Sequence, residues 1–93
     1  MTTYNNCYGG ARILVADDQP SIIDLIRRTI GDSFGCEIET VSSGDQAIAL
    51  LEGTTFDIFL TDMKMPGLHG VPLIDQVVAL CPDTHIVVMT GYP

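Results

Sequence analysis

Acidic side chains follow short apolar runs at separate places in this 93-residue sequence. Asp17 and Asp18 directly follow one run, Asp62 follows another, and a third run leads into the hydroxyl of Thr90. Carboxylates gathered in one place repel one another and tend to take up protons unless a cation lies among them. Oxygen ligands with water filling the remaining positions suit Mg²⁺ better than zinc. These residues therefore indicate a magnesium site.

A carboxylate beside such an ion can stay ionised and react. Aspartate is a known covalent nucleophile for phosphoryl groups. Phosphoryl transfer requires in-line positioning and neutralisation of charge more than elaborate acid–base chemistry. The pattern is consistent with Asp62 as the nucleophile and with Thr90 donating its hydroxyl to a phosphoryl oxygen on Asp62.

The apolar runs must form the strands that bring these groups together. Three runs are rich in Ile and Val and do not alternate, which is typical of strands buried on both faces of a parallel sheet. They lie at residues 12–16, 57–61 and 85–89. A fourth run, residues 36–41, alternates and places Glu37 and Glu39 on one side, as in a half-exposed edge strand.

Helical segments separate the strands. They lie at residues 19–31, 43–53 and 71–83. In the first segment, Pro20 suits the first helical position and Gly31 can end the helix. In the second, Ser43 and Gln46 have the spacing of a capping box. In the third, Pro82 stops the helix. The third helix carries an apolar stripe of Leu73, Ile74, Val77, Val78 and Cys81. The alternating order predicts an α/β fold with a doubly wound parallel sheet.

Parallel strands present their carboxyl ends at one edge of the sheet, where ligands bind in such folds. The acids and Thr90 should therefore meet in one crevice. An Asp after a strand is often only a turn or capping residue, but turn chemistry is a poor explanation for several such residues at matching strand ends. Lys64 is either a solvated charge or a modulator of this pocket. His69 and His85 are expected to be solvated.

Composition narrows the classes of function. The net charge is −8, with 4 basic and 12 acidic side chains, so direct binding of nucleic acid is not expected. The three cysteines form no CxxC pair and suggest thiols in a reducing cytoplasm. No apolar run is long enough to span a membrane. Residues 1–11 read as a flexible tail before a domain at residues 12–93.

The acidic pair in LVADDQP, the segment LTDMKMPGLHG and the segment VVMTGYP together resemble the receiver domain of two-component response regulators. The resemblance implies a flavodoxin-like receiver fold with strand order 2-1-3-4. It implies that Asp62 accepts phosphate from a histidine kinase or phosphotransfer protein, and that Thr90 is the switch hydroxyl. It also implies Mg²⁺ held by Asp17, Asp18, Asp62 and the backbone carbonyl of Lys64.

The resemblance is incomplete at the end of the sequence, which stops at Pro93. The family continues with a helix, a fifth strand carrying a lysine, and a last helix. Three alternatives stay open: a phosphoacceptor that catalyses at most its own phosphorylation and dephosphorylation, a binding-only module without the lysine, and a Mg²⁺ phosphatase with an Asp nucleophile. Without the last elements, the fourth strand is an open edge, Ile22 and Ile26 are partly exposed, and self-association is expected.

Overall fold

The computed structural model describes residues 10–32 and 35–89. Within these ranges, four parallel strands form one sheet in the order β2-β1-β3-β4. The strands are β1 (Arg12–Ala16), β2 (Glu37–Val41), β3 (Ile58–Asp62) and β4 (His85–Met89). The predicted α/β class and the 2-1-3-4 strand order are confirmed.

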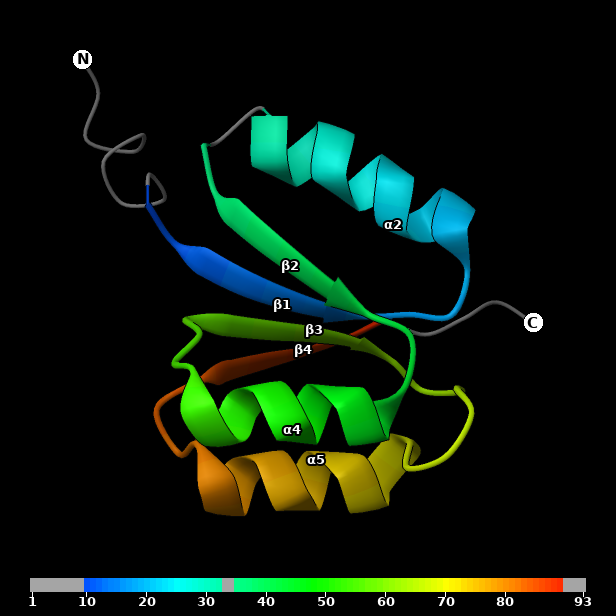
Figure 1. The fold of residues 1–93 in the computed structure, drawn as a ribbon, viewed down its shortest axis with the longest axis vertical. Coiled ribbons are helices and arrows are strands. Elements are labelled where there is room, and N and C mark those ends of the chain that lie inside the picture. The colour runs from blue at the N-terminus through cyan, green and yellow to red at the C-terminus, as the bar shows by residue number, and fades with distance from the viewer. Residues whose placement is uncertain (1–9, 33–34, 90–93) are drawn as a thin grey trace.

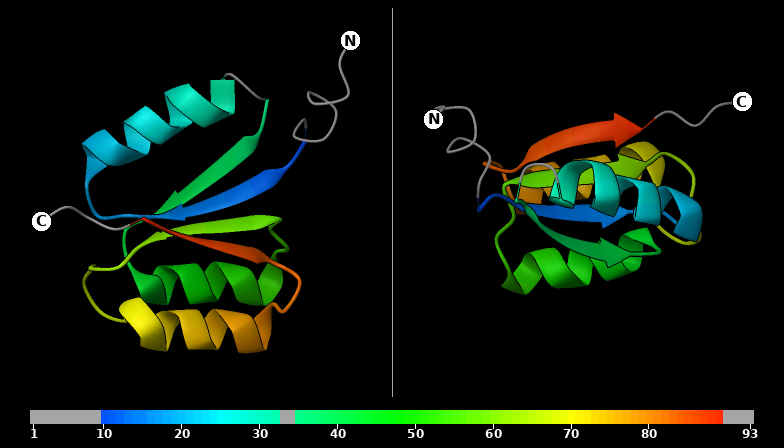
Figure 2. Two further views of the ribbon diagram at one scale, coloured as in Figure 1. Left: turned by 180° about the vertical axis from the view of Figure 1, so that it is seen from behind. Right: turned by 90° about the horizontal axis from the view of Figure 1, so that it is seen from above.

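Helices cover both faces of the sheet. Helix α2 (Pro20–Ile26) runs on as the π-helical segment η1 (Arg27–Gly31) along one face, and α4 (Gly44–Gly53) and α5 (Gly70–Leu80) lie side by side on the other (Figure 1). Seen from behind, the layers are separated in the same way (Figure 2, left). The sheet is therefore doubly wound, as predicted. Of the helices in the described ranges, none is long and apolar enough to cross a membrane.

Strand β1 supplies side chains to both halves of the core. Leu14 and Ala16 pack in the cluster under α4 and α5, whereas Ile13 and Val15 pack with Ile26 of α2. All four of these β1 side chains are buried. This explains why the β1 sequence is continuously apolar and does not alternate.

Strand β4 is less buried than its apolar run alone predicted, whereas the edge position expected from the strand order is confirmed. It lies at the edge of the sheet and pairs with β3. Ile86 packs against one core cluster and Met89 against the other, whereas Val87 and Val88 are 48% and 37% exposed. The apolar pattern of a run does not show how many other strands or helices pack against it. On the opposite edge, β2 has exposed Glu37 and Glu39, as predicted.

The helices also depart from expectation in detail. The first helical segment ends at Gly31 as predicted, but its last five residues are π-helical. Ser43 accepts from the Gln46 N–H, while Gln46 Oε1 accepts from the Ser42 N–H, at 2.9 Å, and not from Ser43 as in a standard capping box. Ile26 is buried, contrary to prediction, and Ile22 is partly exposed. On α5, Val78 lies outside the buried stripe, at 52% exposure.

Polar contacts join the strands at the amino end of the sheet. The backbone N–H of Arg12 donates to Asp57 Oδ2 at 2.8 Å, and Arg12 Nε lies 3.6 Å from Glu37 Oε1. The Arg12 guanidinium carbon lies 5.2 Å from the ring centroid of buried Phe56. Arg12 of β1 therefore contacts the beginnings of both neighbouring strands. His85, at the start of β4, is exposed.

The first residue of α4 lies against the loop that follows β3. A Cβ atom built on Gly44 would overlap the carbonyl oxygen of Leu68 and lie 3.2 Å from Leu73 Cδ2. Gly44 is buried, so no open space is available to relieve the contact. Only a residue without a side chain allows α4 and this loop to come so close.

We expect Gly44→Ala to lower the free energy of unfolding by about 1–3 kcal/mol, because the added methyl group forces backbone to move in a packed region. Gly53→Ala at the other end of α4 is the matched control, since a Cβ there has no atom within 4 Å. The control should be neutral or raise stability by up to about 1 kcal/mol. Urea denaturation measures both, and equal stability of the two variants would contradict the close approach.

Candidate functional site

Three carboxylates meet at the carboxyl end of the sheet. Ala16 of β1 pairs with Thr61 of β3, so the residues that follow in each strand, Asp17 and Asp62, lie next to each other. One oxygen each from Asp17, Asp18 and Asp62 lies within 4.8 Å of the others. The structure therefore brings together the three acids that the sequence singled out. Strand β3 ends at Asp62, one residue later than the predicted run of residues 57–61.

Asp17 is the buried member of the group. It is 3% exposed, whereas Asp18 is exposed and Asp62 is half-buried. The Asp17 N–H donates to the carbonyl of Val41 at 3.1 Å, and Asp17 Oδ1 accepts from the Gln19 N–H at 2.8 Å. Its backbone and its carboxylate are thus both fixed, which leaves Asp18 and Asp62 as the accessible carboxylates.

The backbone around Asp62 is also held in place. Buried Thr61 donates its hydroxyl to the Asp62 carbonyl oxygen at 2.9 Å. Asp62 Oδ1 lies 3.4 Å from the Lys64 N–H, which donates to it. The Asp62 side chain therefore stands at the end of a central strand, partly open to solvent, with the following loop turning around it.

The surroundings of Asp17 disfavour its ionised form. Burial raises the pKa of the Asp17 carboxyl above its ordinary value, the hydrogen bond from the Gln19 N–H lowers this pKa, and the charges of Asp62 and Asp18 raise it further. A cation among these oxygens would remove the cause of the repulsion. The all-oxygen set, with two accessible carboxylates, fits a small divalent ion of the magnesium type.

The remaining predicted site residues are placed as follows. Lys64 is exposed in the loop after β3, which is compatible with the solvated-charge alternative. Thr90 lies outside the described residues, so its predicted role stays a prediction. His69 is exposed at the N-cap position of α5, with Nδ1 2.7 Å from the Gly67 carbonyl oxygen. His69 is solvated, as expected.

Sequence reasoning did not single out Asp45. It lies in the first turn of α4, and its Oδ2 accepts from the Leu68 N–H at 3.2 Å, across 23 positions of sequence. An acid in a first helical turn is visible in the sequence as a favourable partner of the helix dipole. Its contact with the loop before α5 cannot be recognised from the sequence.

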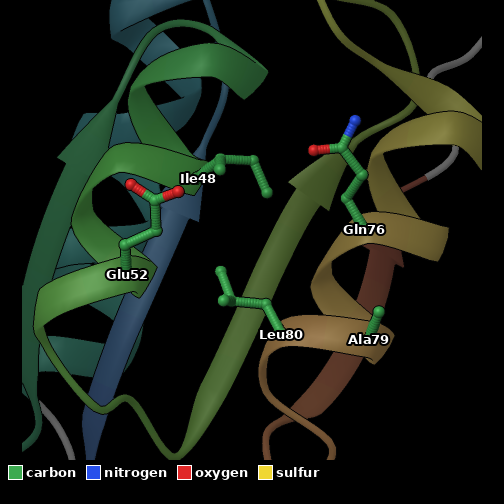
Figure 3. A pocket seen from close by; sticks show the side chains of 5 residues that line it. All are labelled: Ile48, Glu52, Gln76, Ala79 and Leu80. Carbon is green, nitrogen blue, oxygen red and sulfur yellow. The ribbon is translucent and has the colours of Figure 1, made fainter.

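A surface hollow contains none of these residues. It lies between α4 and α5, measures about 290 Å³ and is lined by Ile48, Glu52, Gln76, Ala79 and Leu80. Ile48 and Leu80 point into the space between the two helices (Figure 3). Its lining offers the single carboxylate of Glu52 and no second acid to hold a divalent ion beside it, so the three carboxylates at the sheet edge remain the candidate site.

The raised pKa of Asp17 predicts how stability depends on pH without metal. The folded chain holds the Asp17 proton more tightly than the unfolded chain, for which the ordinary value is 3.8. The free energy of unfolding should therefore fall as pH rises above about 4 and through the raised pKa. Asp17→Asn, which cannot ionise, should gain stability over wild type across this range, as measured by urea denaturation in a chelator.

Asp75→Asn, on the exposed surface of α5, removes the same charge far from the site and serves as the control. The difference in stability between Asp75→Asn and wild type should vary less with pH than the difference between Asp17→Asn and wild type. If the stability of the two variants depends on pH in the same way, the gain in Asp17→Asn comes from net charge alone.

The response regulator receiver domain family matches residues 13–93. The hydrogenase transcriptional regulatory protein HoxA of Cupriavidus necator is 39% identical over 82 residues, which make up 88% of this chain and 17% of HoxA. The chain thus spans about a sixth of that curated relative.

Similar solved structures agree with the family match. An uncharacterized protein from Neptuniibacter caesariensis is 33% identical with a TM-score of 0.84, over 91% of this chain and 62% of that one. The response regulator TrrA of Thermotoga maritima in complex with Mg²⁺-BeF is 30% identical with a TM-score of 0.81, over 88% of this chain and 70% of TrrA. TrrA has also been solved in complex with the histidine kinase ThkA. The family match, the shared fold and the acids at the sheet edge agree: this chain belongs to the receiver domains of two-component response regulators.

Proposed function

We propose that this chain is a phosphoacceptor signalling module of a two-component phosphorelay. The observation that carries the proposal is the meeting of Asp17, Asp18 and Asp62 within 4.8 Å at the carboxyl end of β1 and β3. In this reaction an oxygen of Asp62 attacks the phosphorus of a phosphohistidine. The new O–P bond forms as the N–P bond breaks, and the histidine nitrogen leaves with the electron pair.

Asp17, Asp18 and Asp62 would hold Mg²⁺ through carboxylate oxygens, and Lys64 would hold it through its backbone carbonyl. When bound, the ion supplies positive charge against the phosphoryl oxygens. Asp17 is fixed by Gln19 and Val41 and acts as the rigid ligand, while half-buried Asp62 keeps an oxygen accessible for attack. Burial first, and then the charges of Asp62 and Asp18, raise the pKa of Asp17, and a bound cation would favour its ionised form.

The other parts of the proposal follow from the family. Thr90 would act as the switch hydroxyl that approaches the phosphoryl group. The partner would be a sensor histidine kinase, by analogy with the complex of TrrA with ThkA, or a phosphotransfer protein. The chain would act in the cytoplasm. The chain would catalyse only its own phosphorylation and dephosphorylation, and would not turn over a separate phosphate ester.

The edge strand β4 supports a second proposal, that the 93-residue chain self-associates. In the described part of the chain, β4 pairs with β3 along one side, and its residues His85–Met89 include no Asp, Glu, Lys or Arg. Exposed, uncharged strand edges are templates for pairing with another strand. Exposed Val87 and Val88 would add apolar contact area to such a pairing.

The first proposal predicts labelling at one residue. With Mg²⁺ and a small acyl-phosphate donor, wild type should gain one phosphoryl group and Asp62→Asn none, as measured by intact mass spectrometry. Removing Mg²⁺ should slow labelling by about a hundredfold or more, because charge stabilisation of the transition state is lost. Asp83→Asn, exposed before β4, is the matched control and should label like wild type.

The alternatives predict other results in the same experiment. Magnesium binding without any labelling would favour a binding-only module. Sustained release of phosphate from an ester would favour a phosphatase. Labelling that persists in Asp62→Asn would contradict Asp62 as the acceptor.

The second proposal predicts a mass that grows with concentration. Light scattering over a tenfold range of protein concentration should show this growth for wild type, and Val88→Lys should reduce it by placing a charge on the open strand. Val78→Lys, on a valine of α5 that is 52% exposed against 37% for Val88, should behave like wild type. A wild-type chain that stays monomeric over the whole range would exclude pairing through β4.

A further inference from the structure

The loop of residues 63–69, which follows Asp62 and leads into α5, rests on the amino end of α4. Asp45 Oδ2 accepts from the Leu68 N–H at 3.2 Å. A Cβ built on Gly44 would overlap the Leu68 carbonyl oxygen, and one built on Gly67 would overlap Asp45 Oδ2. Gly67 also has a φ of +71°, which favours glycine. The backbone of Gly67–Leu68 thus fits directly onto Gly44–Asp45.

A simpler role for Asp45 is to stabilise α4, since an acid in the first turn interacts favourably with the helix dipole. That role does not require a contact outside the helix. Ser43 already caps α4 by accepting from the Gln46 N–H. The Asp45 carboxylate instead accepts from a backbone group 23 positions away in sequence. The contact therefore fixes a loop.

This loop carries a proposed ligand of the metal. Its first part is held by the Lys64 N–H, which donates to Asp62 Oδ1 at 3.4 Å. Its middle is held by Met65, which is 6% exposed in the core cluster under α4 and α5. Its last part is held by Asp45 through Leu68. The carbonyl of Lys64 lies in the backbone between these fixed points.

The other boundary of the loop is open. Residues of the loop and of the start of α5, including Lys64, Leu68 and Val71, line a surface groove of about 550 Å³. The loop can shift toward this side when its hold on α4 is lost. Such a shift would move the Lys64 carbonyl away from the three carboxylates.

From these contacts we infer that Asp45 is a positioning residue for the Mg²⁺ site, acting through Leu68 on the loop that presents the Lys64 carbonyl. This inference rests on the proposed function, because it assumes that the ion is held at Asp17, Asp18, Asp62 and Lys64. Asp45 acts by accepting a hydrogen bond. Its negative charge is not the property that matters.

This distinction sets the variants. Asp45→Ala removes the acceptor and the charge, whereas Asp45→Asn removes the charge and keeps an oxygen that can accept from the Leu68 N–H. Gly67→Ala leaves Asp45 in place but adds a methyl group that overlaps its carboxylate, and it also strains the loop backbone at φ +71°, so it supports Asp45→Ala without replacing it. Asp75→Ala, on exposed α5, is the control for loss of one negative charge.

The measurement is Mg²⁺ affinity, from titration of the metal alone followed by backbone amide shifts, with thermal unfolding to check the fold. Asp45→Ala and Gly67→Ala should weaken binding by about tenfold, at the low end for residues that orient metal ligands. Asp45→Asn and Asp75→Ala should bind within about twofold of wild type, since exposed charges at a distance are screened. Hydrogen exchange at the Leu68 amide should accelerate in Asp45→Ala and not in Asp45→Asn.

Each outcome bears on the inference. Equally weakened Mg²⁺ binding in Asp45→Ala and Asp45→Asn would assign the loss of affinity to charge and overturn the inference. Unchanged affinity in Asp45→Ala, with wild type binding Mg²⁺, would also overturn it and leave the proposed function standing. A wild-type chain that binds no Mg²⁺ would overturn both. Should Asp45→Ala fail to fold, Asp45→Asn decides the question, because weaker Mg²⁺ binding with unchanged hydrogen exchange at the Leu68 amide would assign the effect to charge and overturn the inference.

Discussion

The mutual repulsion of three carboxylates at one end of the sheet is the constraint on which the rest of the structure depends. Two parallel strands in register bring Asp17 and Asp62 together, and burial makes the ionised form of Asp17 unfavourable. The fold tolerates this arrangement because both faces of β1 are packed against helices, so that the strand ends cannot move apart. Packing thus maintains an electrostatic conflict that a cation can relieve. A binding site of this kind is formed before its ligand arrives.

Much of this arrangement could be predicted from the sequence because it depends on local patterns. The continuous apolar run of β1 and the acids after β1 and at the end of β3 follow from strand burial and from the geometry of parallel sheets. The exposed Glu37 and Glu39 indicated an edge strand correctly. In each case, the pattern in the sequence reports directly on the surroundings of the strand.

The features that could not be predicted depend on contacts between distant segments. The apolar run His85–Met89 alone looks like a central strand, and its edge position was expected only through the strand order that the family resemblance implied. Gly44 looks like an ordinary first residue of a helix, yet its lack of a side chain is required by Leu68. The π-helical end of the first helical segment had no recognisable sequence signal. Ile26 is buried because β1 provides enough contact area on that face.

The contacts of Arg12 have a further consequence. At the amino end of the sheet, opposite charges and an aromatic ring are paired across three strand beginnings, whereas at the carboxyl end like charges face one another. The two ends of the same strands therefore contribute with opposite sign to the stability of the domain. Sequence changes at the amino end can raise or lower its resistance to unfolding while the reactive geometry persists. Arg12 thus serves the cohesion of the sheet from the end that lies opposite the three carboxylates.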